Sequence, residues 1–284
     1  MSDPILHPFD RSGIAPRSDL ETPEWRDLFS KLQAEQESFL AKEQQFRSPE
    51  YQWPRDALHN WSRVWEYPYL YFHLQKQRDR LANGRRPLLV DVGTGVTFFP
   101  FAVARLGYDL VCTDIDPTCI ADLRRAATVC AHAPGTVQVR RIESDTLPLG
   151  DAEADAVSCI SVLEHIPQCD KTIAEMARIL KPGGLLLLTI DLDLRGDSEI
   201  GPQKHHQLIR LLKEFFSPAC PETTVHPLDA LNTCNSSCPI KVRAGWQKTQ
   251  FLAKQRLRSA LGRQPSPLVS VLLTVQALVL SRNK

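Results

Sequence analysis

The chain has 284 residues, a formal net charge of +1, 43% hydrophobic residues and 24% charged residues. These values suit a soluble globular protein with one large domain or two small ones, and the near-neutral charge argues against a stable nucleic-acid partner. The charge is uneven, because residues 230–284 hold nine Lys and Arg and no Asp or Glu.

Three features predict a cytoplasmic location. The eight cysteines show no paired CxxC spacing, which favours reduced thiols. The N-terminus "MSDPILHPFD" lacks the basic and apolar regions of a signal peptide. The longest apolar stretch, "PLVSVLLTVQALVLS", is too short and interrupted for a transmembrane segment.

Residues 1–85 predict a helical N-terminal cap or lid, since they contain no strand-like run. A helix begins at Thr22 and Pro23, a good cap followed by a proline in the first turn. The stretch 51–81 predicts one or two more helices. It includes the aromatic residues Trp61, Trp65 and Tyr67. These either pack the cap on the domain or form a lid that shapes a substrate pocket.

From residue 86 onward, apolar runs of strand length alternate with helical stretches. The runs are "PLLVDV", "DLVCTDI", "TVQVRRI", "DAVSCISV" and "GLLLLTIDL", with "TTVHPL" and "SVLLTVQALVL" available to complete a sheet. The helices are expected near 97–107, 117–131, 170–181 and 202–216. This order predicts an α/β fold over 86–284, with a doubly wound, mostly parallel seven-stranded sheet and a basic insertion at about 241–264.

A glycine loop follows the first predicted strand, in "DVGTGVTFF". Gly93 permits the sharp turn from strand to helix, and Gly95 lets a ligand approach the backbone. A dinucleotide fingerprint needs a third glycine where Phe98 stands. Asp114 ends the second strand about 20 residues later, where an acid can bind the hydroxyls of a ribose. Asp116 precedes Pro117 and suits the helix cap. The ligand is expected to be a nucleoside.

The ordered segments "VDVGTG…FAVARLGYDLVCTDIDP", "ESDTLPLGDAEADAVSCISVLEHI" and "MARILKPGGLLLLTIDL" resemble the motifs of class I S-adenosylmethionine-dependent methyltransferases, type 11 branch. The resemblance covers about residues 86–193 and implies a Rossmann-like methyltransferase fold with S-adenosyl-L-methionine as cofactor. It implies these cofactor-binding residues: Asp91, Gly93, Gly95, Asp114, Ile115, Asp145 and Thr146. Thr97 and Ser144 replace glycines that are frequent in the family.

Candidate acceptor-site residues follow the fourth and fifth predicted strands. His165 is a candidate general base, because imidazole titrates near neutrality; alternatively, Glu164 and His165 only fix the turn. Asp191 and Asp193 would share one face, where they could orient a substrate, bind a hard cation or remain solvated acids. No metal is predicted, because the His205–His206 pair and the CxxxC spacing are poor zinc patterns.

The sequence therefore predicts methyl transfer to an oxygen or nitrogen of a small metabolite, such as a sugar or a secondary-metabolite scaffold. The acceptor is a small molecule, and a homodimer is left open. Three alternatives remain: a nicotinamide-dependent oxidoreductase, a non-catalytic cofactor-binding or membrane-associated regulatory subunit, and an RNA methyltransferase that uses the basic segment.

Overall fold

The structure is a computed structural model that describes residues 7–82, 84–193, 200–240, 250 and 272–284. The α-helices are α1 (Pro23–Leu40), α2 (Arg63–Ala82), α3 (Phe99–Arg105), α4 (Pro117–Val129), α5 (Cys169–Ile179) and α6 (Pro202–Phe215). The 3-10 helices are η1 (Arg17–Glu21), η2 (Glu43–Gln45), η3 (Leu163–His165) and η4 (Pro227–Asp229). The basic segment predicted at 241–264 lies outside the described residues, apart from residue 250.

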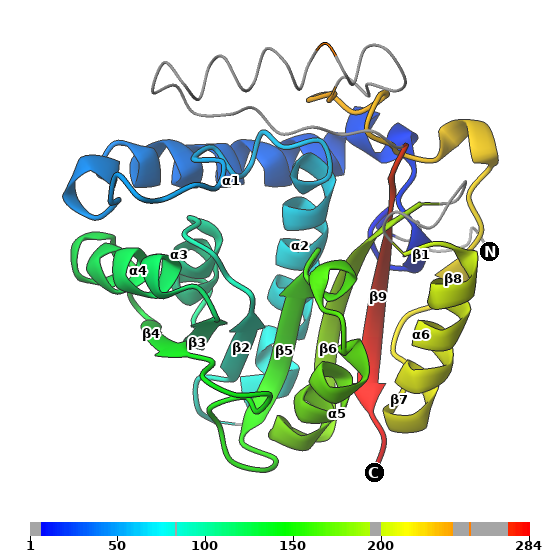
Figure 1. Ribbon diagram of the computed structural model, residues 1–284. Helices are drawn as coiled ribbons and strands as arrows, with labels where there is room; N and C mark the ends of the chain where they lie inside the picture. The colour runs from blue at the N-terminus through cyan, green and yellow to red at the C-terminus, as the bar shows by residue number, and fades with distance from the viewer. Residues whose placement is uncertain (1–6, 83, 194–199, 241–249, 251–271) are drawn as a thin grey trace.

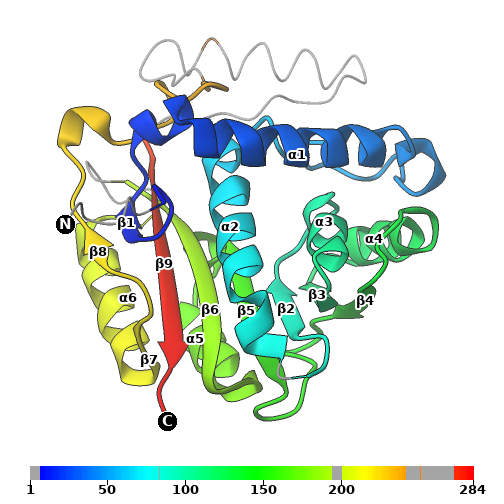
Figure 2. The same cartoon turned by 180° about the vertical axis from the view of Figure 1, so that it is seen from behind.

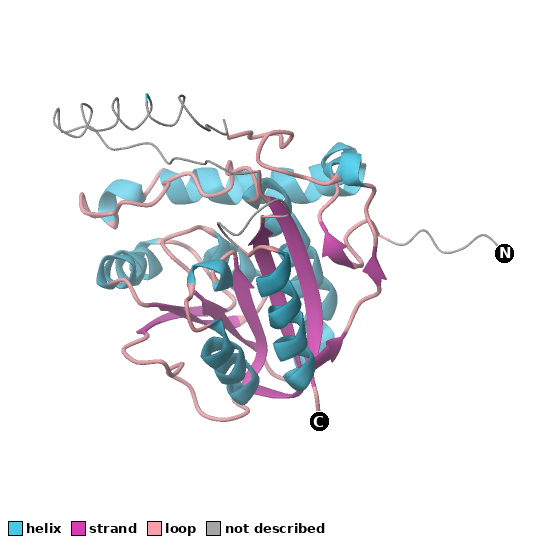
Figure 3. Ribbon diagram, turned by 45° about the vertical axis from the view of Figure 1, so that its right-hand side comes forward, coloured by secondary structure: helices cyan, strands magenta, loops and turns pink. Residues whose placement is uncertain are grey.

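Among the described residues, the strands form one nine-stranded sheet (Figures 1 and 3). They are β1 (Ser12–Ile14), β2 (Leu88–Val92), β3 (Asp109–Asp114), β4 (Thr136–Arg141), β5 (Ala154–Ile160), β6 (Leu180–Leu192), β7 (Phe216–Pro218), β8 (Glu222–Thr223) and β9 (Thr274–Arg282). Their order is β4-β3-β2-β5-β6-β9-β1-β8, and β7 also pairs with β9.

The first five strands of this order are parallel, and β9 runs antiparallel to β6. The predicted doubly wound, mostly parallel α/β sheet is therefore confirmed. It contains two short strands that the sequence did not predict, β1 and β7. Only the start of "TTVHPL" is a strand, because Pro227 has no N–H for a ladder and begins η4 instead.

Two apolar layers cover the sheet. Side chains of α1, α2, α3 and α4 pack in one cluster, and those of α5 and α6 pack in the other. The central strand β5 is buried at every position, which explains its largely apolar sequence. Figures 1 and 2 show α1 lying across the end of the sheet to which β5 points.

Local caps fix where two predicted helices begin. The Thr22 side chain accepts a hydrogen bond from Trp25 N at 3.2 Å, and Asp116 accepts one from Thr118 N at 2.8 Å. Both helices carry a proline in their first turn. Asp116 therefore caps α4, which leaves Asp114 available for another role.

The segment 1–85, expected to be a helical cap, also contributes β1 to the sheet. Gly13 in β1 pairs with Thr223 on one side and with Ala277 on the other. Trp61, expected in a helix, lies before the first residue of α2. The boundary between cap and domain at residue 85 stays a prediction.

Candidate active site

The glycine loop leaves the carboxyl end of β2 with two residues in the left-handed region. Gly93 has φ 71° and Gly95 has φ 60°. A Cβ at Gly93 would lie 2.6 Å from the Val162 side chain, whereas a Cβ at Gly95 would meet no atom within 4 Å. Gly93 is therefore required by packing, and Gly95 borders open space that a ligand can enter.

Asp114 lies at the carboxyl end of β3, beside this loop. One of its carboxylate oxygens accepts a hydrogen bond from Gly95 N and the other accepts one from Asp116 N, each at 2.9 Å. A carboxylate has about four lone-pair positions, so both oxygens can still accept from a ligand. The next side chain, Ile115, is 70% exposed although it is large and apolar.

Asp91, in β2, connects the glycine loop to the neighbouring strands through hydrogen bonds. Its carboxylate accepts a hydrogen bond from Ser158 Oγ at 2.6 Å, and its carbonyl accepts from Thr94 Oγ1 at 2.9 Å and Thr113 Oγ1 at 3.0 Å. Burial raises the pKa of Asp91 to about 6, against the effect of these hydrogen bonds. The carboxyl group thus links β2 to β5.

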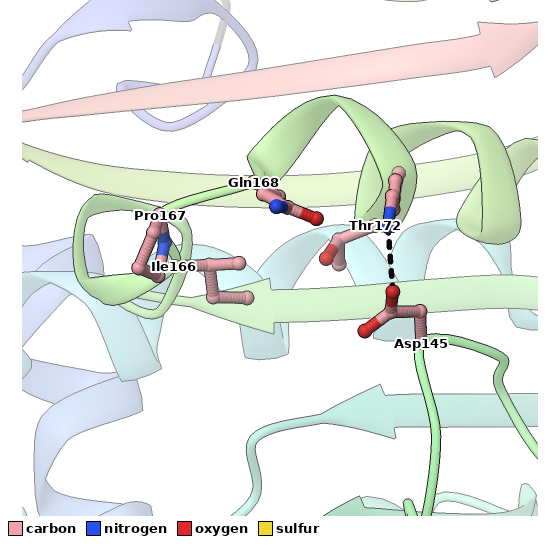
Figure 4. Close-up of a pocket in the computed structure, with 6 residues that line it drawn as sticks. Asp145, Ile166, Pro167, Gln168 and Thr172 are labelled. Atoms are coloured by element: carbon pink, nitrogen blue, oxygen red, sulfur yellow. Dashed lines mark hydrogen bonds and ion pairs between the residues drawn. The ribbon is translucent and has the colours of Figure 1, made fainter.

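The loop after β4 carries Asp145 and Thr146. Both residues are exposed, Asp145 forms an ion pair of 2.7 Å with Lys171, and Thr146 Oγ1 lies 2.5 Å from Ser144 Oγ. A hollow of about 500 Å³ is lined by Asp145, Ile166, Pro167, Gln168, Lys171 and Thr172 (Figure 4). Its volume is within the range of small-molecule sites, about 300–1,000 Å³.

A second group of polar side chains gathers at the carboxyl ends of β5 and β6, under the start of α2. We call Arg63, Glu66, Ser161, Glu164 and Asp191 the crevice cluster. Arg63 forms an ion pair with Glu66 and donates to Ser161 Oγ at 2.9 Å. Ser161 Oγ donates to Glu66 Oε1 at 2.7 Å and lies 3.5 Å from Asp191 Oδ1.

Glu164 is the unusual member of the crevice cluster. Its Oε1 accepts a hydrogen bond from Asp191 N at 3.1 Å. Its Oε2 is buried and has no hydrogen-bond partner among the described residues. Burial, reinforced by the nearby charge of Glu66, raises the pKa of Glu164 from 4.5 to about 8. This carboxyl group can therefore exchange a proton near neutral pH.

The predicted acceptor-site residues lie in different surroundings. Asp191 belongs to the crevice cluster, whereas Asp193 is almost fully buried and its N donates to Ile200 O at 3.1 Å. His165 is exposed at the end of η3, and its N donates to Val162 O at 3.0 Å.

The three aromatic residues predicted for the cap, Trp61, Trp65 and Tyr67, are all buried. Trp65 Nε1 donates to Asp19 Oδ2 at 2.8 Å and its ring stacks on Tyr69, which favours the packing interpretation for this residue. Tyr67 stacks on Phe99, in the helix that follows the glycine loop. The Trp61 carbonyl accepts a hydrogen bond from Ser236 Oγ at 2.7 Å.

Sequence analysis missed most of the crevice cluster. Arg63 and Glu66 are spaced by one helical turn, a signal for an ion pair, and Glu164 adjoins the candidate His165. No local signal marks Ser161, which has φ 46° at the end of β5. None of the described helices is both long and apolar enough to cross a membrane.

Residues 90–188 match a family model described as a methyltransferase domain. The chain is 35% identical over 115 residues to an uncharacterized methyltransferase of Mycobacterium ulcerans, a match that covers 40% of this chain and 43% of the relative. It is 31% identical over 101 residues to a ubiquinone biosynthesis O-methyltransferase of Methylococcus capsulatus, covering 35% and 41%. The match thus spans less than half the length of these relatives.

Two solved structures share the fold. The [4+2]-cyclase SpnF superposes with a TM-score of 0.54 at 18% identity, covering 96% of this chain and 99% of that one. A Galdieria sulphuraria protein, described as a sarcosine dimethylglycine methyltransferase, gives a TM-score of 0.51 at 16% identity, covering 76% of this chain and 87% of that one. Because one of the two is a cyclase, the fold does not by itself define the reaction.

Proposed function

Residues 90–188 form a class I S-adenosylmethionine-dependent methyltransferase domain, and from this premise we propose that the chain methylates an oxygen or nitrogen atom of a small metabolite. The acceptor would lie at the crevice cluster, beside the carboxyl ends of β5 and β6. One observation supports this most directly: among the described residues, the Glu164 carboxyl group has a buried, unpartnered Oε2 within the crevice cluster.

The residues at the strand ends fit the cofactor. Open space beside Gly95 suits its amino-acid part, and the Asp114 carboxylate suits its ribose hydroxyls. The exposed side chain of Ile115 offers an apolar surface for a purine. Asp145, which lines the hollow after β4, and its neighbour Thr146 would contact the adenine amino group. We propose Asp91 as the residue that positions the loop.

The reaction needs little from the protein besides alignment and one proton transfer. The cofactor supplies a methyl group on a sulfonium, which is already an excellent leaving group. A hydroxyl or ammonium acceptor must lose its proton, and a carboxylate with a pKa of about 8 can take it at Oε2 of Glu164. The hydrogen bonds of Arg63 and Glu66 with Ser161 would hold α2 over the acceptor and exclude water from it.

Two measurements test this function. In calorimetry we expect S-adenosylmethionine and S-adenosylhomocysteine to bind and NAD not to bind. With isotope-labelled methyl groups, we expect mass spectrometry to find the label on hydroxylated or amine-bearing metabolites. Binding of NAD alone would support the oxidoreductase alternative, label on RNA would support the RNA-modifying alternative, and cofactor binding without transfer would support the regulatory subunit.

The two loop glycines should respond differently to a methyl group. Gly93→Ala is expected to lower the free energy of unfolding by roughly 2–4 kcal/mol, because the new Cβ collides with Val162 and φ is unfavourable. Gly95→Ala is expected to cost only about 1–2 kcal/mol of stability. Its Cβ enters open space, and cofactor affinity should fall. Denaturant unfolding and calorimetry measure the two effects. Unchanged affinity in folded Gly95→Ala would exclude this approach of the cofactor.

Asp114→Ala is expected to weaken S-adenosylmethionine binding by roughly 1.5–3 kcal/mol, the scale of a lost hydrogen bond to a charged group. Asp109→Asn is the matched control, since Asp109 lies at the opposite end of β3. Calorimetry on both folded variants decides the matter. The ribose assignment fails if the two variants bind the cofactor equally well.

A further inference from the structure

Three side chains of types that bind metals lie close together outside the proposed active site. They belong to Asp10, His73 and Cys220. Each offers one ligand atom, and these atoms all lie within 4.8 Å of one another. The three residues come from the loop before β1, the middle of α2 and the connection between β7 and β8. Figure 2 shows the N-terminal segment, in dark blue, between β8 and α2. His73 lies about 15 Å further along α2 than Arg63.

His73 has the hydrogen bonding of a metal ligand. Its ring is completely buried, and Nε2 lies 2.7 Å from the Phe9 carbonyl oxygen. Because a carbonyl oxygen only accepts, Nε2 carries the proton and Nδ1 carries the lone pair. Nδ1 is buried without a hydrogen-bond partner among the described residues. With its proton on Nε2 and no acceptor beside Nδ1 in the described part of the chain, the buried imidazole is in its neutral form. Metal-binding histidines are commonly anchored in this way through the other nitrogen.

One carboxylate oxygen of Asp10 is fixed by a hydrogen bond and the other faces Cys220. Oδ2 accepts a hydrogen bond from Lys76 at 2.5 Å, whereas Oδ1 lies 3.7 Å from Cys220 Sγ. In a tetrahedral zinc site, bonds of about 2.3 Å to sulfur and about 2.0 Å to oxygen place these two atoms about 3.5 Å apart. The sulfur and Oδ1 are therefore already near the separation that a shared ion requires.

Cys220 is buried, and its thiol faces the Asp10 carboxylate. A bound divalent cation would displace the thiol proton to solvent, since the thiolate is the ligand. One thiolate, one carboxylate and one neutral imidazole would balance the two positive charges of the ion. Such balance matters in a buried site, where an unpaired charge is costly.

We propose that Asp10, His73 and Cys220 bind a zinc ion, with water as the fourth ligand. Mixed sulfur, nitrogen and oxygen ligands are typical of zinc among the available divalent cations. The ion would connect the N-terminal segment to α2 and to the β7–β8 connection, and would thereby stabilise the edge of the sheet that contains β1 and β8.

The test uses the full chain, stripped of metal by a chelator and titrated with zinc chloride or cobalt chloride. We expect one equivalent to bind, a thiolate-to-cobalt charge-transfer band to appear and the unfolding temperature to rise as the site fills. Cys220→Ser and Asp10→Asn should weaken binding at least tenfold and remove or shift the band. Cys130→Ser is the matched control, because Cys130 and Cys220 are both 8% exposed.

Two results would overturn the site. One is a wild-type protein that binds no stoichiometric metal. The other is binding that survives Cys220→Ser but is lost in Cys234→Ser or Cys238→Ser. If Cys220→Ser does not fold, alkylation of the wild-type protein decides instead. Zinc must then protect Cys220 from the reagent, as mapped by mass spectrometry, and equal modification with and without zinc contradicts the proposal.

Discussion

Replacing Glu164 by Gln is expected to lower kcat for methyl transfer by about 100- to 10,000-fold, the usual effect of losing a general base. The amide fills the same volume beside Asp191 N but cannot take a proton. Cofactor affinity should remain unchanged. Among the described residues, no hydrogen bond joins the Glu164 side chain to a residue proposed to bind the cofactor. Fixed-time assays of S-adenosylhomocysteine formation measure kcat, and calorimetry measures cofactor affinity.

His165→Ala provides the comparison for this variant. His165 is exposed, whereas the Glu164 carboxyl is buried within the crevice cluster. We expect the histidine variant to lose much less activity. A large loss in His165→Ala together with near-normal activity in Glu164→Gln would transfer the role of base to the histidine.

The raised pKa of Glu164 also predicts how activity and stability change with pH. Activity should rise as pH passes through about 8, because the base must be ionised. Stability should change in the opposite direction: between 4.5 and 8 the folded state holds more protons than the unfolded state. The stabilisation that Glu164 contributes is complete below pH 4.5 and is lost as the pH rises through 8. Over this range the free energy of unfolding falls by up to about 1.4 kcal/mol per pH unit. Glu164→Gln should remove both dependences.

Arg63→Met is expected to lower the free energy of unfolding by about 3–5 kcal/mol, the cost of leaving one partner of a buried ion pair alone. Glu66 is completely buried, and its remaining hydrogen bond comes from Ser161 Oγ. The Arg63 guanidinium lies over the Tyr67 ring, 5.6 Å from its centroid, and methionine is an uncharged, flexible side chain that can fill part of this space. Denaturant unfolding measures the loss.

The double variant Arg63→Met/Glu66→Leu separates charge from packing. Removing both charges should recover most of the lost stability, since apolar replacements of buried ion pairs are often neutral or better. If the double variant is as unstable as the single one, packing rather than the unpaired carboxylate explains the loss.

Most of the fold could be predicted because its signals are local. Apolar runs of strand length predicted the five parallel strands, and Thr22 and Asp116 predicted the starts of two helices. β1 could not be predicted in the same way. It has three residues, and its pairing partner Ala277 lies at the other end of the chain. Its extended conformation is imposed by the sheet and not by its own sequence.

The candidate site was predictable only in part, for a related reason. The residues proposed for the cofactor follow strand ends in a fixed order, so a motif can predict them. The crevice cluster joins Arg63 and Glu66 of α2 to Ser161 and Asp191 of the sheet, and nothing in the linear sequence brings them together. The raised pKa of Glu164 comes from burial, which exists only once these elements pack.

The position of β9 between β6 and β1 limits how much of the sheet can form while the chain is being synthesised. On the ribosome, β1 emerges early but cannot pair until residues 274–282 have been translated, on the order of tens of seconds later at about 5–20 residues per second. Once β6 has emerged, the edge that β9 will cover stays open until β9 pairs with it, which invites pairing with other chains. Nascent chains should therefore depend on chaperones late in synthesis, and messages truncated before β9 should yield aggregated product.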